Sequence, residues 1–417
     1  MDLDYPADIE VFRAEVRSIL AEELPAGWRG IGAIPTEAQT ADFVGTWRET
    51  LYRRGLIGVA WPEQYGGRGL SKLHQVVLVE ELVRRGLPFG RLPQDATGFK
   101  MLGNILLMFG TEEQKQEFLP GLLSGELRYC QGFSEPGAGS DLASATTRAV
   151  LRDGEWRIDG QKIWTSGALD SNGIFVLART DPDAPKHRGL SFLLVPLDQP
   201  GVEVRPIRHF AGGNEFCEVF FTDARCRADL VIGEVGGGWQ IARALLEFER
   251  GEEAATNPLL FRAEYDRLVA LARHNGAIAD SVVRQRLGRL YARVEVMRYL
   301  GYRILTEVLE GKRLSAAASV SKLYWSEYHQ EVTALALDVE GLDGMIMRGK
   351  GPSRPMRTDD PGADPLSTQS WWQVMLNSRT GTIYAGTTEV QRSILGEALL
   401  GLPRDAPPPA KAAVQPA

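Results

Sequence analysis

Hydrophobic periodicity changes twice along this chain, and this change constrains the fold more than any other feature. From residue 7 to about 126, apolar residues recur at the three- and four-residue spacing of amphipathic helices. Between about 127 and 233 the pattern becomes short β-rich runs separated by turn residues, for example Leu190–Val195. Helical spacing returns from Trp239 onward. The order predicts an α+β fold with a β-barrel between two helical domains.

Breaks in these patterns predict the domain organisation. The last helical region is interrupted at Asn275–Gly276, at Glu310–Gly311 and in the Gly- and Pro-rich stretch 349–365, which favours a bundle of four or five helices. The residues after Arg404 are too poor in large apolar groups to pack. The predicted units are an N-terminal α-helical domain (1–126), a middle β-barrel domain (127–233), a C-terminal four-helix-bundle domain (234–405) and a disordered tail (406–417).

Composition excludes several classes of protein. The 417 residues carry 47 basic and 54 acidic side chains, a net charge of −7, so we expect no nucleic-acid partner. No apolar run is long enough to span a membrane, and the acidic start lacks the features of a secretory signal. The three cysteines, Cys130, Cys217 and Cys226, fit neither a zinc site nor a disulfide framework, which indicates reduced thiols in a cytoplasmic protein. The five histidines show no ligand spacing, so no metal is predicted.

Three short motifs carry the functional signal. The segment Ser134–Asp141 reads SEPGAGSD, and its small residues leave backbone amides bare enough for a phosphate or a flat ring to approach. The segments Gly160–Ser166 (GQKIWTS) and Gly386–Arg392 (GTTEVQR) follow in that order. Each segment also has a structural interpretation. The first could be a surface turn, Trp164 could belong to the barrel core, and Thr388 with Gln391 could form a capping box.

Taken together, these motifs resemble the acyl-CoA dehydrogenases, flavoprotein oxidoreductases of lipid metabolism. The resemblance runs from about residue 5 to about residue 405 and implies the same fold, the cofactor FAD, and transfer of electrons to an electron-transfer flavoprotein. It implies that an acyl-CoA thioester is oxidised to a trans-2-enoyl-CoA. A carboxylate removes the α-proton while the β-hydrogen leaves as hydride.

The position of the catalytic base departs from the commonest pattern of the family. Many members carry a Glu directly before the Gly-Thr of the last motif, but this chain has Ala385 there. A minority place the Glu on the first long helix of the C-terminal domain, immediately before an arginine, and Glu249–Arg250 matches that arrangement. Helical spacing from Trp239 through Ala242 and Leu246 sets Glu249 on an apolar stripe, where burial would raise its pKa. Glu247 points elsewhere and is the weaker candidate, and the alternative for Glu249 is that it ends the stripe in solvent.

The resemblance also implies roles for the other motif residues. Ala385 supplies a backbone amide to the thioester oxygen, Ser140 faces the pantetheine arm, and Arg250 supports the substrate side. Because the side chain of Ala385 is smaller than that of a glutamate, it would free space beside the acyl chain, which leads to the hypothesis of a bulky or branched acyl group. The residues implied to contact the cofactor are Gln131, Phe133, Ser134, Trp164, Thr165, Ser166, Thr387 and Glu389.

Two departures from the family concern assembly. Many homo-oligomeric members carry an Arg-x-x-Phe-Gly run whose arginine reaches the pyrophosphate of a neighbouring subunit's flavin, and 271–280 (LARHNGAIAD) lacks it. The usual Gly-Gly-Asn-Gly turn reads Gly341–Gly344 (GLDG). This pattern resembles catalytic subunits that pair with an unlike, related chain. Two other functions stay open at this point: a flavin oxidase or monooxygenase of the same fold, and a non-catalytic structural subunit. The acyl group and the pathway are not encoded in a readable motif.

Overall fold

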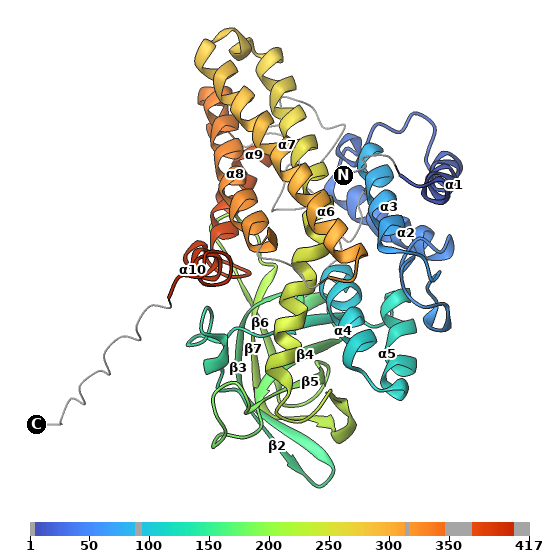
Figure 1. Ribbon diagram of the computed structural model, residues 1–417, viewed down its shortest axis with the longest axis vertical. Helices are drawn as coiled ribbons and strands as arrows, with labels where there is room; N and C mark the ends of the chain where they lie inside the picture. The colour runs from blue at the N-terminus through green and yellow to red at the C-terminus, as the bar shows by residue number, and fades with distance from the viewer. Residues whose placement is uncertain (1–4, 88–93, 313–316, 347–368, 404–417) are drawn as a thin grey trace, which may run out of the picture.

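The computed structural model describes residues 5–87, 94–312, 317–346 and 369–403, with side chains throughout these ranges except at 94, 247–253, 317 and 369–370. The predicted tail (406–417) and the predicted break at 349–365 lie outside the described residues. Along the chain, helices precede and follow one sheet in the order that the sequence predicts, and in space the C-terminal bundle lies above the sheet with the N-terminal helices beside it (Figure 1). None of the described helices is long and apolar enough to cross a membrane.

The N-terminal part is helical. Its longer helices bury apolar residues at helical spacing, as Ile9, Phe12 and Val16 of the first helix illustrate. One segment is a π-helix, which periodicity could not distinguish from an α-helix. The helices are α1 (Ala7–Glu23), α2 (Glu37–Arg53), α3 (Lys72–Arg84), the π-helix η3 (Gln94–Gly103), α4 (Asn104–Phe109) and α5 (Glu112–Ser124), with short 3₁₀ turns at Ile31–Ala33 and Glu63–Tyr65.

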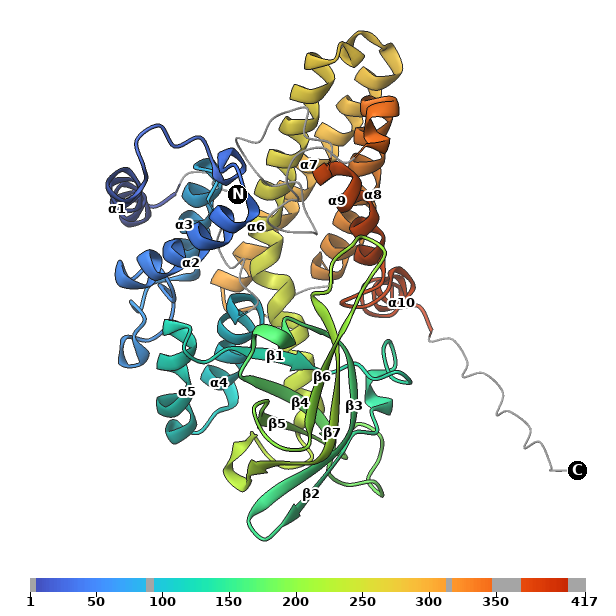
Figure 2. The ribbon, with the colours of Figure 1, turned by 180° about the vertical axis from the view of Figure 1, so that it is seen from behind.

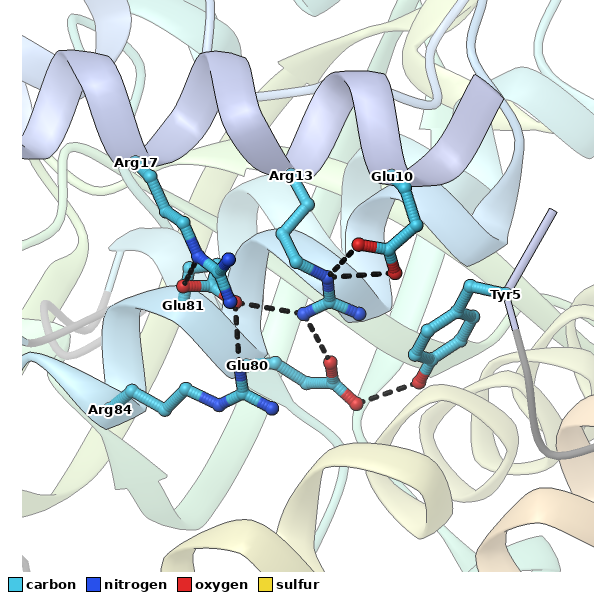
Figure 3. Close-up of polar contacts among 7 residues, drawn as sticks. All are labelled: Tyr5, Glu10, Arg13, Arg17, Glu80, Glu81 and Arg84. Carbon is cyan, nitrogen blue, oxygen red and sulfur yellow. Dashed lines mark hydrogen bonds and ion pairs between the residues drawn. The ribbon is translucent and has the colours of Figure 1, made fainter. Parts of the chain in front are cut away.

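A cluster of charged side chains fastens α1 to α3 (Figure 3). Arg13 is at its centre: its Nη1 lies 2.8 Å from both the Glu80 and the Glu81 carboxylates, and all three side chains are about 5% exposed. Tyr5 donates to Glu80 at 2.7 Å, which ties the chain entering α1 to the same cluster. Arg17 and Arg84 also pair with Glu81, so each buried carboxylate has a cationic partner.

The middle part is a single eight-stranded sheet. The hydrogen-bonded order is β6-β7-β3-β2-β4-β5-β8, and β1 pairs in parallel with β4. Since this path has two ends, the described strands form a curved, partly closed barrel (Figure 2). The strands are β1 (Tyr129–Gly132), β2 (Arg148–Arg152), β3 (Glu155–Ser166), β4 (Gly173–Arg179), β5 (Leu190–Pro196), β6 (Val202–Ile207), β7 (Phe216–Arg227) and β8 (Val231–Ile232).

The sheet and the N-terminal helices share one core. Strands β4 and β5 are apolar and buried along almost their whole length because α6 packs against both of them. Ile241, Ala242 and Leu245 of α6 belong to the same core as the strands and α1. The three cysteines are free and buried in the sheet region, in agreement with the prediction of reduced thiols.

The C-terminal part is a bundle with a separate core. Its helices are α6 (Gly238–His274), α7 (Ser281–Leu309), α8 (Ala317–Glu340), α9 (Gln369–Ser378) and α10 (Thr388–Ala398). Helix α6 ends at the predicted Asn275–Gly276, where Gly276 is left-handed, and α7 ends at the predicted Glu310–Gly311. Helix α6 runs from the sheet up into the bundle, and α10 lies at the base of the bundle beside the sheet (Figures 1 and 2).

Candidate active site

The first motif forms a tight turn directly after β1. Glu135 and Ala138 exchange backbone hydrogen bonds of 2.9 and 3.0 Å, which leaves Pro136 and Gly137 exposed at the tip. Neither Gly137 nor Gly139 is left-handed, and an added Cβ would meet no protein atom within 4 Å at either position. The fold itself therefore does not require these glycines, and the space beside them is open to a molecule from outside the chain.

A buried lysine forms hydrogen bonds with the beginning of this turn. Lys162 of β3 is 0% exposed, and its ammonium donates to the carbonyl oxygens of Phe133 (3.0 Å) and Leu177 (2.8 Å) and to the Glu135 carboxylate (2.8 Å). Two of the acceptors come from the beginning of the motif turn, and the third comes from β4. Lys162 thus joins the turn to two strands of the sheet.

The Glu135 carboxylate, like the Lys162 ammonium, forms several hydrogen bonds. It accepts hydrogen bonds from the backbone amides of Thr146 (2.7 Å) and Thr147 (2.9 Å). Burial raises the pKa of the Glu135 carboxyl, but the Lys162 charge and these hydrogen bonds lower it more, to about 2. Burial lowers the pKa of Lys162 to about 8 against the opposing charge of Glu135, so the pair is ionised at neutral pH.

Sequence reasoning missed the Lys162–Glu135 pair, although Glu135 lies in the first motif and Lys162 in the second. A signal was present, because Lys162 falls in phase with the inward residues Trp156 and Ile158 of the same strand. A lysine at an inward strand position requires a buried partner. Glu135, the acidic residue of the first motif, is that partner.

The second motif lies at the end of β3 and presents an exposed tryptophan. Trp164 is 56% exposed and has a left-handed φ of +61°, which is uncommon for a bulky residue. The register of β3 against β7 shifts between Lys162 and Thr165, and this irregularity turns the Trp164 side chain outward. The interpretation of Trp164 as barrel core is therefore wrong.

The neighbours of Trp164 differ in exposure. Thr165 is 0% exposed, and its hydroxyl finds no partner among the described residues. Ser166 is exposed. The Ile163 amide donates to the Ser134 carbonyl at 2.9 Å, so the first and second motifs lie side by side.

The other residues of the first motif point in different directions. Gln131 and Ser134 are half-buried, whereas Phe133 is buried with its ring edge-on to Phe175 (5.8 Å) and Phe192 (6.1 Å). The Phe133 ring is therefore enclosed by these two rings and is not exposed beside the turn.

Ser140 is exposed. The next residue, Asp141, forms an ion pair with Lys186 of the β4–β5 loop. In the same loop, the His187 ring lies 4.8 Å from that of Trp239, in the first turn of α6. The first motif, the β4–β5 loop and the start of α6 are thereby linked.

The third motif forms a strained turn before α10. Thr387 caps this helix, accepting from the Val390 amide at 3.2 Å, so the alternative interpretation of Thr388 and Gln391 as a capping box is wrong. Glu389 is exposed, and hydrogen bonds from its own amide and from Thr387 lower its pKa. No hydrogen bond or ion pair between described residues joins Thr387 or Glu389 to the first two motifs.

The backbone conformation of Ala385 bears on its implied role as an amide donor to the thioester oxygen. It is half-buried, and its φ of +52° is left-handed, a region that alanine rarely adopts. In the part of the chain that the structure describes, the Ala385 amide donates no hydrogen bond. An unpaired, partly buried amide in a fixed turn is available to an acceptor from outside the chain.

The expected base lies on α6, whose backbone is helical throughout 238–274. The side chains of Glu249 and Arg250 lie outside the described residues. The stripe expected along Trp239, Ala242 and Leu246 is partly wrong, since only Ala242 of these is buried and the other two are half-buried. The buried line runs instead through Ile241, Ala242 and Leu245, and position 249 follows Leu245 by one helical turn.

Comparison with known proteins identifies the family. The models of the acyl-CoA dehydrogenase N-terminal, middle and C-terminal domains match residues 6–126, 130–224 and 236–400. Acyl-CoA dehydrogenase IpdE1 of Mycobacterium tuberculosis is 42% identical over 404 residues, which cover 96% of this chain and 99% of that protein.

Solved structures of similar fold support the same family. The Tcur3481-Tcur3483 steroid ACAD superposes with a TM-score of 0.79 at 35% identity, covering 97% of this chain and 100% of that one. The ChsE4-ChsE5 complex from Mycobacterium tuberculosis gives 0.77 at 28% identity, with the same coverage.

The family is FAD-dependent, and the residues present here fit that group. An open glycine turn lies beside an exposed Trp164, and the buried Thr165 hydroxyl has no partner among the described residues. The described residues contain no group of three or more His, Cys, Asp or Glu side chains that could hold a metal ion. From its motifs, its order of elements and these matches, the chain belongs to the acyl-CoA dehydrogenase family.

Proposed function

We propose that this protein catalyses the FAD-dependent α,β-dehydrogenation of an acyl-CoA thioester to a trans-2-enoyl-CoA. The observation that carries the proposal is the joining of the first two motifs. The Ile163–Ser134 hydrogen bond sets an open glycine turn beside an exposed, strained Trp164. A chain that bound nothing would have no use for an outward-facing tryptophan in a left-handed conformation, which costs folding free energy.

The proposed roles divide between the chemistry and its support. Glu249 removes the α-proton of the substrate, and Arg250 supports the substrate side. The Ala385 amide donates to the thioester oxygen, on which negative charge develops as the proton leaves. When bound, FAD supplies the acceptor for the hydride. Ser140 contacts the pantetheine arm. The residues proposed to hold the cofactor are Gln131, Phe133, Ser134, Trp164, Thr165, Ser166, Thr387 and Glu389.

We further propose that the enzyme works in the cytoplasm with two protein partners. An electron-transfer flavoprotein accepts the electrons. An unlike, related subunit completes the cofactor site, since the Arg-x-x-Phe-Gly run is missing from 271–280. The similarity to the ChsE4-ChsE5 complex supports this second partner.

The substrate class follows from a small residue at the reaction centre. Ala385 stands where many relatives carry a glutamate, and it is half-buried, so space beside the thioester is freed. A similar structure is described as a steroid ACAD. We therefore propose a bulky or branched acyl group.

The test is the visible absorption spectrum of the purified protein, alone and co-expressed with its candidate partner, under anaerobic acyl-CoA addition. Bound flavin that bleaches would support dehydrogenation, and bleaching only in the two-chain complex would support the unlike subunit. Oxygen uptake without a thioester would favour the oxidase or monooxygenase instead.

The base has a matched control within the same helix. We expect Glu249→Gln to retain flavin but to lose bleaching at least a hundredfold, the usual contribution of a positioned base. Glu247→Gln is the control and should bleach like the parent. Equal bleaching of the Glu249→Gln complex would assign the chain to the non-catalytic, structural class.

A further inference from the structure

Two buried side chains hold the turn that contains Ala385. Gln391 of α10 is 0% exposed, and its Nε2 donates to the Ala385 carbonyl at 3.0 Å. Lys322 of α8 is 4% exposed, and its Nζ donates to the Gly386 carbonyl at 2.7 Å. Two consecutive carbonyls are therefore anchored from two different helices.

The donor role of Gln391 is fixed by its surroundings. Exchanging its amide nitrogen and oxygen would place Oε1 against the Ala385 carbonyl, and two acceptors would then face each other. Gly386 makes the approach possible, because its φ is +88° and an added Cβ would collide with Gln391 Nε2. The Gln391 Oε1 atom is buried and has no partner among the described residues, so donation to Ala385 is the polar interaction that this side chain is placed to make.

The turn is also held on its other side. The amides of Ile383 and Tyr384 both donate to the Thr380 carbonyl, at 2.8 and 3.1 Å. Hydrogen bonds therefore restrain the backbone before and after Ala385, while its own amide stays unpaired among the described residues. Its left-handed φ of +52° persists because the surroundings impose it.

We propose that Gln391 and Lys322 are positioning residues that aim the Ala385 amide at the thioester oxygen of the substrate. This inference rests on the proposed dehydrogenation. A hydrogen bond weakens steeply as its angle departs from linearity, and a donor helps a developing oxyanion only if it is already in place. Freed of its anchors, the left-handed turn would relax, and the amide would point away from the oxygen.

The experiment replaces each anchor in the flavin-loaded enzyme, with its partner subunit if loading requires one. Gln391→Leu keeps the volume and removes the donor, and Lys322→Met does the same for the second carbonyl. Loss of a whole oxyanion donor costs about 10²–10³ in kcat. For these positioning residues we expect kcat to fall about 10- to 100-fold, with KM within about threefold of the parent.

A second readout separates positioning from stability. A bound 3-thia-acyl-CoA, which is not oxidised, loses its α-proton at a pH that reflects stabilisation of the enolate oxygen. We expect both variants to shift this midpoint upward by about one pH unit, the counterpart of a tenfold weaker stabilisation. Flavin content should stay unchanged.

The control is Gln114→Leu in α5. Gln114 is also buried, and its Nε2 donates to the carbonyls of Asp229 and Val231, far along the chain from the turn. This variant should lose thermal stability but keep the parent midpoint and kcat. The proposal is overturned if Gln391→Leu and Lys322→Met bleach and ionise the thioester like the parent. If the parent itself does not bleach with any acyl-CoA, the proposed function has failed instead.

Discussion

At the scale of single residues, backbone strain coincides with the motifs. Among the residues that the structure describes, four other than glycine have positive φ: Asp153, Trp164, Asp223 and Ala385. Aspartate tolerates this region, and Asp153 precedes Gly154 in the two-residue β2–β3 hairpin turn. Tryptophan and alanine do not share that tolerance. The two costly conformations thus lie in the second motif and directly before the third, where binding or catalysis can justify them.

The Lys162–Glu135 pair leads to a prediction at the same scale. Replacing Glu135 by Gln leaves the buried ammonium without a counter-charge, and breaking such a pair typically costs about 3–5 kcal/mol. The folded-state pKa of Glu135, about 2, lies below its ordinary value of 4.5. Its stabilising contribution is therefore complete above about pH 4.5 and is lost as the pH falls toward 2.

Urea unfolding at pH 7, 4 and 3 measures this effect. We expect Glu135→Gln to lower the free energy of unfolding at pH 7, and the difference from the parent to shrink as the pH falls. Glu203→Gln, which removes an exposed partner of Arg205, is the control and should leave the unfolding midpoint unchanged. A difference that stays constant from pH 7 to 3 would contradict the assigned ionisation.

The motif residues show how far sequence alone reaches. Spacing and residue type located the three segments, and the resemblance supplied the roles implied for their residues. Spacing and residue type could not predict which side chains are exposed. Trp164 faces outward because of a bulge, and Phe133 faces inward because two strands bring Phe175 and Phe192 around it. Lys322 was also beyond reach, since its contact with Gly386 joins residues 64 positions apart.

At the scale of elements, the backbones of α6 and α7 approach each other closely near Gly301. Pro258 has no amide to donate to the Ala254 carbonyl one turn earlier in α6. Gly301 of α7 packs against that carbonyl, and an added Cβ would collide with it. The proline frees the carbonyl and the glycine lets α7 approach it, just beyond the segment that carries Glu249.

This crossing predicts opposite effects for one substitution at two positions of α7. Gly301→Ala should destabilise the protein by about 1–3 kcal/mol, because the methyl group would force the helices apart. Gly288 is exposed, and an added Cβ would meet nothing within 4 Å. Gly288→Ala should therefore stabilise it by up to about 1 kcal/mol through helix propensity.

Thermal unfolding of both variants provides the measurement. Flavin bleaching adds a second readout, because separation of the helices should also lower kcat in Gly301→Ala alone. A Gly301→Ala protein as stable as the Gly288→Ala protein would show that α7 does not pack this tightly.

Element boundaries were predictable where glycine ends a helix, and element type was not always predictable. The ends of α6 and α7 follow from Asn275–Gly276 and Glu310–Gly311, since each break contains a left-handed glycine. The π-helix η3 has no comparable signal. Its wider winding accompanies the packing of Gly98 against the Tyr129 backbone and of Gly103 against the Trp61 ring, contacts made only in the folded chain.

At the scale of the whole molecule, the site draws on two hydrophobic cores. Ser134 follows β1 and Trp164 lies in β3, and the core of this sheet also contains the N-terminal helices and the start of α6. The Ala385 turn is attached to α8 and α10, and α8 belongs to the separate core of the bundle. Helix α6 is shared, since Ile241 lies in the first core and Leu268 in the second.

Two separate cores predict two units of local stability. Leu335 of α8 and Leu193 of β5 are both 0% exposed, one in each core, and truncation to alanine costs about 2–5 kcal/mol in such sites. If the bundle opens without the sheet, Leu335→Ala should accelerate amide hydrogen exchange in α8 by at least about 30-fold and leave β4 within about threefold of the parent. Leu193→Ala should give the reverse pattern.

Opening of the bundle alone also predicts an order of events as urea is added. Because α6 keeps its first turns in the sheet core, the first two motifs would remain formed while the Ala385 turn is lost, and flavin binding would persist at urea concentrations that abolish bleaching. Equal acceleration of α8 and β4 by either variant would mean that α6 makes the chain one cooperative unit, in which case flavin and bleaching would be lost together.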